Sequence, residues 1–412
     1  MKRILSLFVM GAMTLQRVVA ERAESIRDFD FTGGKTKPGC VAVSAGGMYS
    51  DTNGFGFEMG ASLMTSSNCI TSDKSFLFSV KLPEGNYSVT ATFGDDAAGS
   101  DNTVKAELRR LMAEKIITKK GDAVSRTFVV NIRTPKIAGG SGVRLKAREK
   151  EGEMVNWDDK LTLEFNGSRP ALRSLKIEPV KVPTVFLLGD STVCDQPREP
   201  WNSWGQMLPR FFGPGVAVAN HAQSGESIKS SLSAKRFEKV FSAMKTNDWL
   251  FVQFGHNDMK DKATNALAVY KANLKKLVQQ TRERGATPVL VTSMERKGGI
   301  ERDTLAGYPQ TVRDVAKEDG VALIDLHAMS RVLYRAMGKN LDKAFQDGTH
   351  HNNYGSYELA RCVVEGIRAN VPTLAKLLAT DSGVFDPAHP DDPEQFKMAV
   401  SAAVDDKKPD GN

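Results

Sequence analysis

The chain changes rhythm at Thr184, and this change constrains its fold more than any other feature of its 412 residues. After Thr184, short apolar runs alternate with amphipathic helical patterns. The runs are 185–188, 216–219, 249–254, 288–292 and 321–325. One helical pattern repeats apolar residues from Tyr270 to Val278, and another from Tyr357 to Ile367. Strands that are apolar on both faces and alternate with helices predict a parallel sheet covered on both sides.

The part of the chain before Thr184 has a different pattern. Short runs with period-two alternation are separated by Gly, Asn and Asp, at 75–80, 87–93, 126–132, 160–165 and 172–177. This spacing predicts an all-β sandwich. Residues 106–119 can be read as a helix, but we expect a β-hairpin or an irregular insert there. Pro179 and Pro183 bracket a short linker.

These patterns divide the chain into segments. We expect a β-sandwich domain over 25–180, an α/β domain over 184–378 and a polar tail over 379–412. The tail is rich in Asp and Pro, so we expect it to pack loosely or not at all.

The first twenty residues have the features of a secretory signal peptide. Lys2 and Arg3 precede a mostly apolar stretch, and small or modest side chains precede a cleavage point after Ala20. An ordinary amphipathic helix is the alternative. From these features we expect a secreted or periplasmic protein. We expect no membrane span, because no apolar run reaches ~18 residues.

Composition excludes several functions. Lys and Arg total 56 against 49 Asp and Glu, but no basic block of five occurs, so we expect no nucleic acid partner. The four cysteines form no CxxC pair, and we expect no metal and no cofactor. A Cys40–Cys69 disulfide is conceivable, but Cys194 and Cys362 leave three connectivities open.

Two motifs after predicted strands could supply a nucleophile and its base. Gly189-Asp190-Ser191-Thr192 follows the first strand of the second half, where a serine at a tight turn stands above the sheet. Asp347 and His350 lie three apart before the last helix, so the carboxylate can orient the imidazole toward Ser191. The plain alternatives are a capping serine and a capping aspartate beside a surface histidine.

Two further motifs could stabilise an oxyanion. Gly225 follows the second strand and would let a backbone N–H approach, and Asn257 follows the third strand and carries an amide N–H. We expect His256 to be a structural hydrogen-bonding residue. With the N–H of Ser191 these groups make three oxyanion donors. Nucleophile, base, orienting carboxylate and donors together make the set that acyl transfer needs.

The four blocks resemble the SGNH (GDSL-type) hydrolase superfamily, and in particular its rhamnogalacturonan acetylesterase-like branch. Stretches 203–206, 220–227, 253–260 and 349–355 add to a resemblance that covers roughly 184–375. It implies a flavodoxin-like α/β/α domain. Much less specifically, it implies that the first half is similar to the galactose-binding-like sandwich found before some of these esterases.

The resemblance also implies a function, namely removal of O-acetyl groups from plant cell-wall polysaccharide such as pectin or rhamnogalacturonan. Ser191 would attack the acetyl carbonyl, His350 would transfer the proton and Asp347 would fix the His350 tautomer. Ser191, Gly225 and Asn257 would hold the oxyanion. The substrate would be an acetylated polysaccharide or oligosaccharide, bound in an open cleft.

Several alternatives remain at this stage. The domain could be a broad-specificity lipase or thioesterase, a xylan acetylesterase, or an acetyltransferase that uses the same triad. It could also be a vestigial esterase in a non-catalytic glycan-binding protein. For Trp204 we expect core packing, whereas Trp201 is open to a role with sugar rings. The sequence leaves the acetylated hydroxyl and the oligomeric state open.

Overall fold

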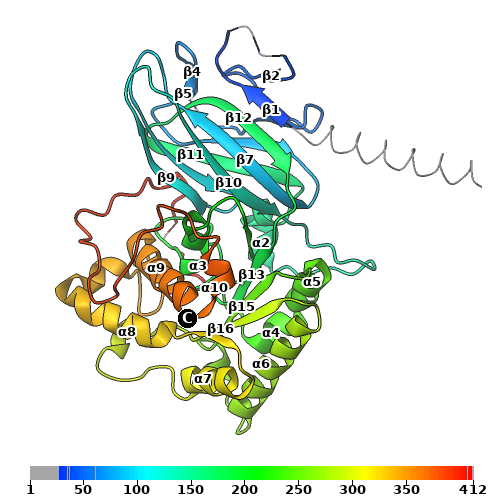
Figure 1. Ribbon diagram of the computed structural model, residues 1–412, viewed down its shortest axis with the longest axis vertical. Coiled ribbons are helices and arrows are strands. Elements are labelled where there is room, and N and C mark those ends of the chain that lie inside the picture. Colours follow the sequence, from blue (N-terminus) through cyan, green and yellow to red (C-terminus); the bar gives the residue numbers. More distant parts are fainter. Residues whose placement is uncertain (1–26, 35, 37, 61, 406, 411–412) are drawn as a thin grey trace, which may run out of the picture.

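The computed structural model describes residues 27–34, 36, 38–60, 62–405 and 407–410. Two stacked sheets form one end of the molecule, and a third sheet between helices forms the other (Figure 1). Residues 1–20, the expected signal peptide, lie outside the described residues.

The two stacked sheets come from the first part of the chain. Their strand orders are β10-β7-β12-β1-β2, with β5 and β4 added beside β12, and β3-β6-β11-β8-β9. The strands are β1 (Arg27–Asp30), β2 (Val41–Ala42), β3 (Phe55–Phe57), β4 (Met64–Thr65), β5 (Ile70–Thr71), β6 (Phe76–Lys81), β7 (Gly85–Phe93), β8 (Ser100–Ala106), β9 (Arg110–Thr118), β10 (Val124–Ile132), β11 (Lys160–Arg169) and β12 (Ala171–Pro179).

Period-two alternation explains why these strands form a sandwich. In β7, Tyr87, Val89, Ala91 and Phe93 are buried and their neighbours are partly exposed. Equivalent residues of the facing sheet complete one continuous apolar core. Residues 106–119, where a hairpin or an irregular insert was expected, form the turn and the second strand of a hairpin. Its strands β8 and β9 pair antiparallel through a turn in which Glu107 and Arg109 have positive φ.

The third sheet is parallel and has the order β14-β13-β15-β16-β17. Numbered from its first strand this is 2-1-3-4-5, the flavodoxin-like order of doubly wound folds. The strands are β13 (Thr184–Gly189), β14 (Ala217–Asn220), β15 (Trp249–Gln253), β16 (Thr287–Val291) and β17 (Ala322–Ile324). They coincide with the predicted apolar runs, give or take one or two residues.

Helices cover both faces of this sheet, because alternate residues of each strand face opposite ways. Val185 and Leu187 of β13 pack in one core, and Phe186 and Leu188 pack in the other. The first core is closed by α3 (Trp204–Met207), α8 (Leu326–Met337), α9 (Asn353–Asn370) and α10 (Pro372–Ala375). The second is closed by α4 (Ile228–Ser233), α5 (Arg236–Ala243), α6 (Ala266–Arg282) and α7 (Tyr308–Glu318), on the other side in Figure 1.

Short helices occur in the connections. One of them, α2 (Ala147–Glu151), follows β10 and precedes β11 in the chain. In space it lies beside the parallel sheet (Figure 1). The others are the 3-10 turns η1 (Met154–Asn156), η2 (Leu208–Phe211), η3 (Asp258–Lys260), η4 (Lys297–Gly299) and η5 (Gly338–Ala344).

Buried ion pairs join the sandwich to the α/β part. Arg110 of β9 lies 3.3 Å from the carboxylate of Asp195, and Arg109 lies 2.6 Å from that of Glu199. On the other flank, Arg236 of α5 lies 2.5 Å from Glu149 of α2. Removing one partner of such a pair leaves an uncompensated buried charge, so these contacts fix how the two parts pack.

The expectation of a loosely packed tail after Ala379 is wrong. Phe385 and Ser401 are buried, and Val404 forms a β-bridge with Glu199. The Ser401 hydroxyl accepts a hydrogen bond from Lys105 and donates one to Glu164 in the sandwich. Scattered apolar and hydroxyl side chains therefore anchor a segment whose overall composition is polar.

The conceivable Cys40–Cys69 disulfide is absent, because Cys69 is a free thiol. Cys194 and Cys362 are buried free thiols as well.

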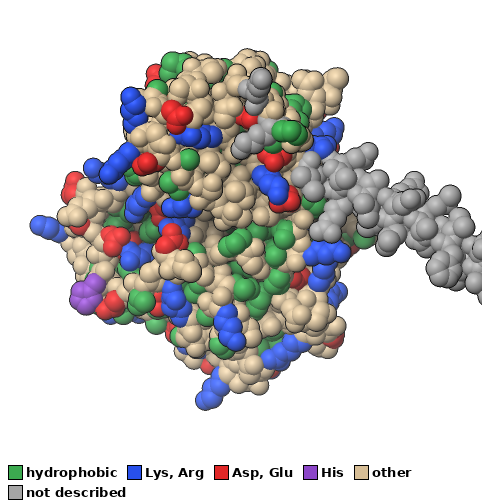
Figure 2. Space-filling model, turned by 45° about the horizontal axis from the view of Figure 1, so that its top comes forward, with side chains coloured by type: hydrophobic (Ala, Val, Ile, Leu, Met, Phe, Trp, Pro, Cys, Tyr) green, Lys and Arg blue, Asp and Glu red, His purple; other side chains and the backbone are tan. Residues whose placement is uncertain are grey.

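Among the described residues, none of the helices combines the length and the apolar character that crossing a bilayer requires. On the face in Figure 2, Lys and Arg side chains lie interspersed with Asp and Glu.

Candidate active site

Ser191 lies just beyond the carboxyl end of β13, the second strand in the order of the parallel sheet. The turn into it requires Gly189, because a Cβ there would lie 2.6 Å from Val193 and 2.7 Å from the Gln253 carbonyl. Doubly wound sheets bind ligands at this edge. Ser191 itself is buried, with 3% of its surface exposed.

His350 connects Ser191 to Asp347. Its Nε2 lies 2.8 Å from the Ser191 Oγ, and its Nδ1 lies 2.9 Å from the Asp347 Oδ2. An ionised carboxylate only accepts, so Nδ1 carries the proton and Nε2 accepts from the Ser191 hydroxyl. The structure thus brings together the three side chains that the sequence singled out.

The Asp347 carboxylate is held in its charged form. Burial opposes the charge, but hydrogen bonds from the His350 ring and from backbone N–H groups outweigh it and lower the Asp347 pKa. The N–H groups of Thr349 and His350 each donate to Oδ1 at 2.7 Å. The local turn of the chain therefore orients the carboxylate before any substrate arrives.

The adjacent His351 has a different environment. Its Nε2 lies 2.9 Å from the Tyr334 hydroxyl, and its ring packs against Phe345. Burial, with a contribution from the His350 charge, lowers the His351 pKa to about 3. His351 is therefore a neutral packing residue, and the Asp-x-x-His spacing selects His350 as the residue that faces Ser191.

Gly225 lies in the loop between β14 and α4. Its φ of +75° is in the left-handed region that favours glycine. Gln196 links this loop to the nucleophile turn, since its Nε2 donates to the Ser191 carbonyl at 2.7 Å and to the Ser224 Oγ at 3.3 Å. The sequence did not single out Gln196, because nothing local distinguishes it from other polar loop residues.

Asn257 follows β15 and is partly buried. Its side-chain Nδ2 donates to the Glu226 carbonyl at 3.1 Å, and its Oδ1 accepts from Lys260. One of the two amide N–H bonds is thus used to fix the side chain beside the Gly225 loop, and the second N–H remains for a ligand. Asn257 therefore contacts the loop that holds Gly225.

Two neighbours of these residues have structural roles. His256 contacts the Asp190 carboxylate at 3.3 Å and the Met294 carbonyl at 3.1 Å. It thereby links the segment after β13 to the segment after β16. Asp258 accepts from the Ile228 N–H at the start of α4. Burial, aided by the nearby charge of Asp190, raises the Asp258 pKa to about 7.

The two tryptophans of the 201–204 segment differ. Trp204 is buried, and its Nε1 donates to Gln253 at 2.8 Å, as expected for core packing. Trp201 stands edge-on to the His350 ring, with 5.8 Å between ring centroids, and its Nε1 donates to the Asp405 carbonyl of the tail. Trp201 therefore packs against one side of the His350 imidazole.

A cavity of about 220 Å³ opens beside Trp201 and Gln196. Its walls come from three distant parts of the chain, namely the α2 region, the loop after β13 and the tail. Asp410 of the tail lies 3.5 Å from Arg148, and its Cβ lies 3.1 Å from the position that a Cβ on Gly225 would occupy. The tail therefore borders the loop that holds Gly225, a contact that the sequence did not predict.

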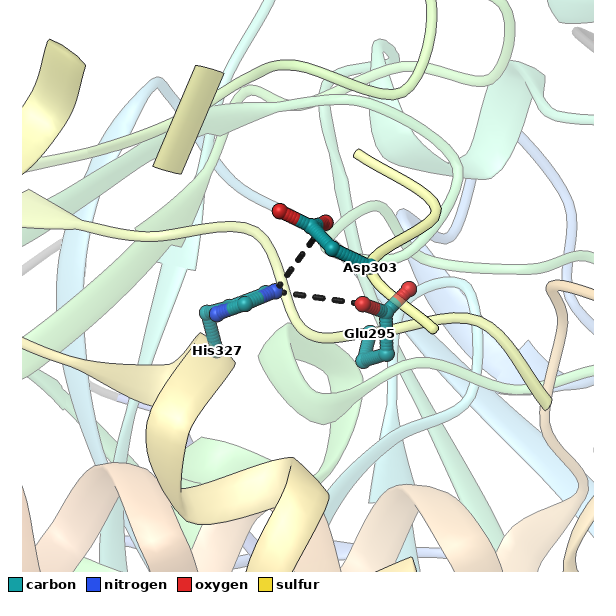
Figure 3. A group of neighbouring side chains, drawn as sticks. All are labelled: Glu295, Asp303 and His327. Carbon is teal, nitrogen blue, oxygen red and sulfur yellow. Dashed lines mark hydrogen bonds and ion pairs between the residues drawn. The ribbon is translucent and has the colours of Figure 1, made fainter. Parts of the chain in front are cut away.

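A second cluster of polar side chains lies at the end of β16. His327 Nε2 lies 3.2 Å from Glu295 and 3.7 Å from Asp303 (Figure 3). Its Nδ1 faces the Arg313 guanidinium at 3.1 Å. Arginine only donates, so Nδ1 is the acceptor and Nε2 carries the proton. In this tautomer the cluster is a hydrogen-bond network, in which the protonated Nε2 donates to Glu295.

This network supports the loop that carries Arg296. The Arg296 guanidinium contacts the Thr349 hydroxyl at 3.3 Å and the His256 carbonyl at 3.4 Å. The Lys297 N–H donates to the Gly348 carbonyl. Arg296 is therefore a brace between two strand ends and the Asp347–His350 turn, with its charge directed inward.

The fold and the site define a class of protein before any comparison is made. It is a doubly wound α/β protein. At the carboxyl edge of its sheet a serine is hydrogen-bonded to a histidine, and the histidine is hydrogen-bonded to an aspartate. In this arrangement the imidazole can remove the serine proton, and Gln196 joins the serine turn to the loop that holds Gly225.

Comparison with known proteins places the chain further. A model of the GDSL-like lipase/acylhydrolase family matches residues 187–357. Rhamnogalacturonan acetylesterase RhgT of Bacillus subtilis (strain 168) is 37% identical over 206 residues, which cover 44% of this chain and 88% of RhgT. YxiM of the same organism, an uncharacterized esterase, is 26% identical over 370 residues, which cover 83% of this chain and 91% of YxiM. The crystal structure of YxiM aligns with a TM-score of 0.46 at 24% identity, over 84% of this chain and 98% of that one.

The chain belongs to the SGNH (GDSL-type) hydrolase superfamily, within its rhamnogalacturonan acetylesterase-like branch. The resemblance noted from the four motifs is thereby confirmed.

Proposed function

We propose that the protein is an exported serine esterase that removes O-acetyl groups from plant cell-wall polysaccharide, with pectin or rhamnogalacturonan as substrate. The observation that carries the proposal is the unbroken contact from the Ser191 Oγ through His350 to Asp347, at 2.8 and 2.9 Å. The identity to RhgT, a rhamnogalacturonan acetylesterase, supports the substrate class.

The proposed reaction has two halves. Ser191 attacks the acetyl carbonyl carbon while His350 Nε2 takes its proton, and the imidazolium is stabilised by Asp347. The tetrahedral intermediate collapses as His350 returns the proton to the departing sugar hydroxyl, which leaves an acetyl-enzyme. Water then attacks by the same route and releases acetate.

The oxyanion of each tetrahedral intermediate is assigned to three donors. They are the backbone N–H groups of Ser191 and Gly225 and the second side-chain N–H of Asn257. Preorganised donors in a water-poor site stabilise the developing charge without reorganisation, and one of them typically contributes about 2.7–4 kcal/mol. Because Asn257 is already fixed by Glu226, its N–H is held in place.

The β-sandwich is proposed to be a galactose-binding-like module over 25–180 that braces the cleft or contacts the polymer. Residues 184–378 form the catalytic domain in this proposal, and 1–20 form the signal peptide of a secreted or periplasmic protein. Ion pairs between the sandwich and the α/β part, such as Arg110 with Asp195, support the bracing role.

Acetate release across a panel of acetylated pectin, acetylated rhamnogalacturonan and acetylated xylan tests the proposal. We expect release from the first two, and none above background from the Ser191→Ala variant. Faster release from xylan would overturn the pectin assignment, and a preference for octanoyl over acetyl p-nitrophenyl esters would favour a lipase. Release by the serine variant at the wild-type rate would overturn the mechanism.

A further inference from the structure

The loop that holds Gly225 is contacted by a lysine side chain from outside the parallel-sheet domain. Lys146 directly precedes α2, and in the chain α2 comes after the sandwich strand β10 and before β11. Lys146 therefore lies outside the residues that match the family model. Its Nζ donates to the Ser224 carbonyl at 2.5 Å and lies 3.1 Å from the Glu226 carboxylate. A Cβ on Gly225 would lie 3.3 Å from the same ammonium.

The Ser224 carbonyl and the Gly225 N–H belong to one peptide group. A hydrogen bond to a carbonyl oxygen draws electron density toward that oxygen, so the N–H of the same peptide becomes a stronger donor. Linked hydrogen bonds strengthen one another in this way, by about 10–30% per bond. A charged donor such as an ammonium has roughly twice the effect of a neutral one.

Lys146 is held in this position by an anchored backbone. Its N–H donates to the Glu149 carboxylate at 2.9 Å, and Glu149 is itself fully buried. Glu149 accepts from Trp157 at 3.0 Å and pairs with Arg236 of α5 at 2.5 Å. The start of α2 is therefore fastened to the α/β part, and the ammonium is preorganised beside the Ser224–Gly225 peptide.

From this geometry we propose that Lys146 is a positioning residue of the active site, which polarises the Ser224–Gly225 peptide so that its N–H binds the oxyanion more strongly. The proposal rests on the esterase function and on Gly225 as an oxyanion donor. It also assigns a chemical contribution to the first part of the chain, because the charge beside the Ser224 carbonyl comes from a residue between two sandwich strands.

Steady-state kinetics with p-nitrophenyl acetate test the proposal in the full chain. We expect Lys146→Met to lower kcat and kcat/KM together by about ten-fold with KM unchanged, since the interaction strengthens only in the transition state. This loss is smaller than the 10²–10³-fold that removal of a whole donor costs. Lys146→Arg keeps the charge and the donor, and should recover most of the rate.

Two controls separate polarisation from a merely structural role. Lys150→Met removes an exposed lysine from the same helix and should leave kcat and Tm unchanged. Glu226→Gln removes the ion-pair partner but keeps the Lys146 bond to Ser224, and should retain more activity than Lys146→Met. Equal losses in the Met and Arg variants, or a loss confined to KM, would overturn the proposal.

An NMR measurement tests the same bond without using activity. The sequence contains three Ser-Gly pairs, at 141–142, 224–225 and 382–383, so labelling serine with ¹³C and glycine with ¹⁵N selects three amide signals. Loss of a hydrogen bond at the preceding carbonyl should move the Gly225 ¹⁵N signal upfield in Lys146→Met, with Gly383 unmoved. An unmoved Gly225 signal would overturn the proposal. Absence of turnover in the wild-type protein would instead count against the esterase function.

Discussion

The Nε2 atom of His350 lies 2.8 Å from the Oγ of Ser191, although 159 residues separate the two in the chain. The contact forms because Ser191 follows β13, an interior strand of the sheet, and His350 lies in a turn that precedes α9. Both places lie at the carboxyl edge of the parallel sheet. Packing of strands and helices, and not local sequence, therefore brings the nucleophile to its base.

Asp347 is expected to set the tautomer of His350. In Asp347→Asn the side-chain amide would present an N–H to Nδ1, so Nε2 would carry the proton and could not accept from Ser191. We expect kcat to fall by about 10⁴-fold while the fold is preserved. Turnover of p-nitrophenyl acetate and circular dichroism check both parts, and a fall below ten-fold would contradict the assigned role.

Asn257 is expected to contribute to transition-state binding. Asn257→Ala removes the proposed oxyanion donor, and we expect kcat to fall by about 10²–10³-fold with little change in KM. Asn370→Ala, on the outer end of α9, is the matched control and should keep wild-type kinetics. An effect confined to KM would show that Asn257 binds substrate and leaves the oxyanion to other groups.

Asp258 is expected to make stability depend on pH. Its pKa is raised in the folded protein from 3.8 to about 7, so the folded state holds a proton that the unfolded state has lost between these values. The contribution of Asp258 to stability is therefore present below pH 4 and is lost as pH rises to about 7.

Asp258→Asn removes this titration while its Oδ1 can still accept from Ile228. The free energy of unfolding of the variant, relative to wild type, should rise between pH 4 and 7 and stay level above about pH 8. Urea unfolding at several pH values measures it. A difference that is independent of pH would show that folding does not raise the pKa of Asp258.

The tail is expected to restrict access to the site. Asp410→Ala removes the ion pair with Arg148 beside Gly225. An exposed pair of this kind contributes at most about 1 kcal/mol, so KM for the acetylated polymer should fall by up to about five-fold. Turnover of the small ester should hardly change. A higher KM for the polymer would indicate that Asp410 binds substrate.

The sequence predicted the features that local pattern controls. Strands such as β13 are apolar on both faces, and motifs such as Gly189-Asp190-Ser191 follow them directly, so both the sheet and its reactive edge could be inferred. For 106–119 a hairpin or an irregular insert was expected in place of a helix, and these residues form the turn and second strand of the β8–β9 hairpin.

Contacts between distant segments could not be predicted in this way. Lys146 and Asp410 reach the Gly225 loop from parts of the chain far from it in sequence, and neither lies in a pattern that distinguishes it from other surface charges. The tail was expected to be loose because its composition is polar, yet Ser401 and Phe385 anchor it in places that only the folded protein creates. Composition describes an average, whereas packing depends on single side chains.

Ester hydrolysis is expected to depend most directly on the hydroxyl of Ser191. Turnover of p-nitrophenyl acetate should be abolished in Ser191→Ala, while Ser231→Ala, which removes an equally buried hydroxyl from α4, should retain turnover. Both variants should unfold at close to the wild-type Tm. If Ser191→Ala kept wild-type turnover while folded, Ser191 would not be the nucleophile and the mechanism would be wrong.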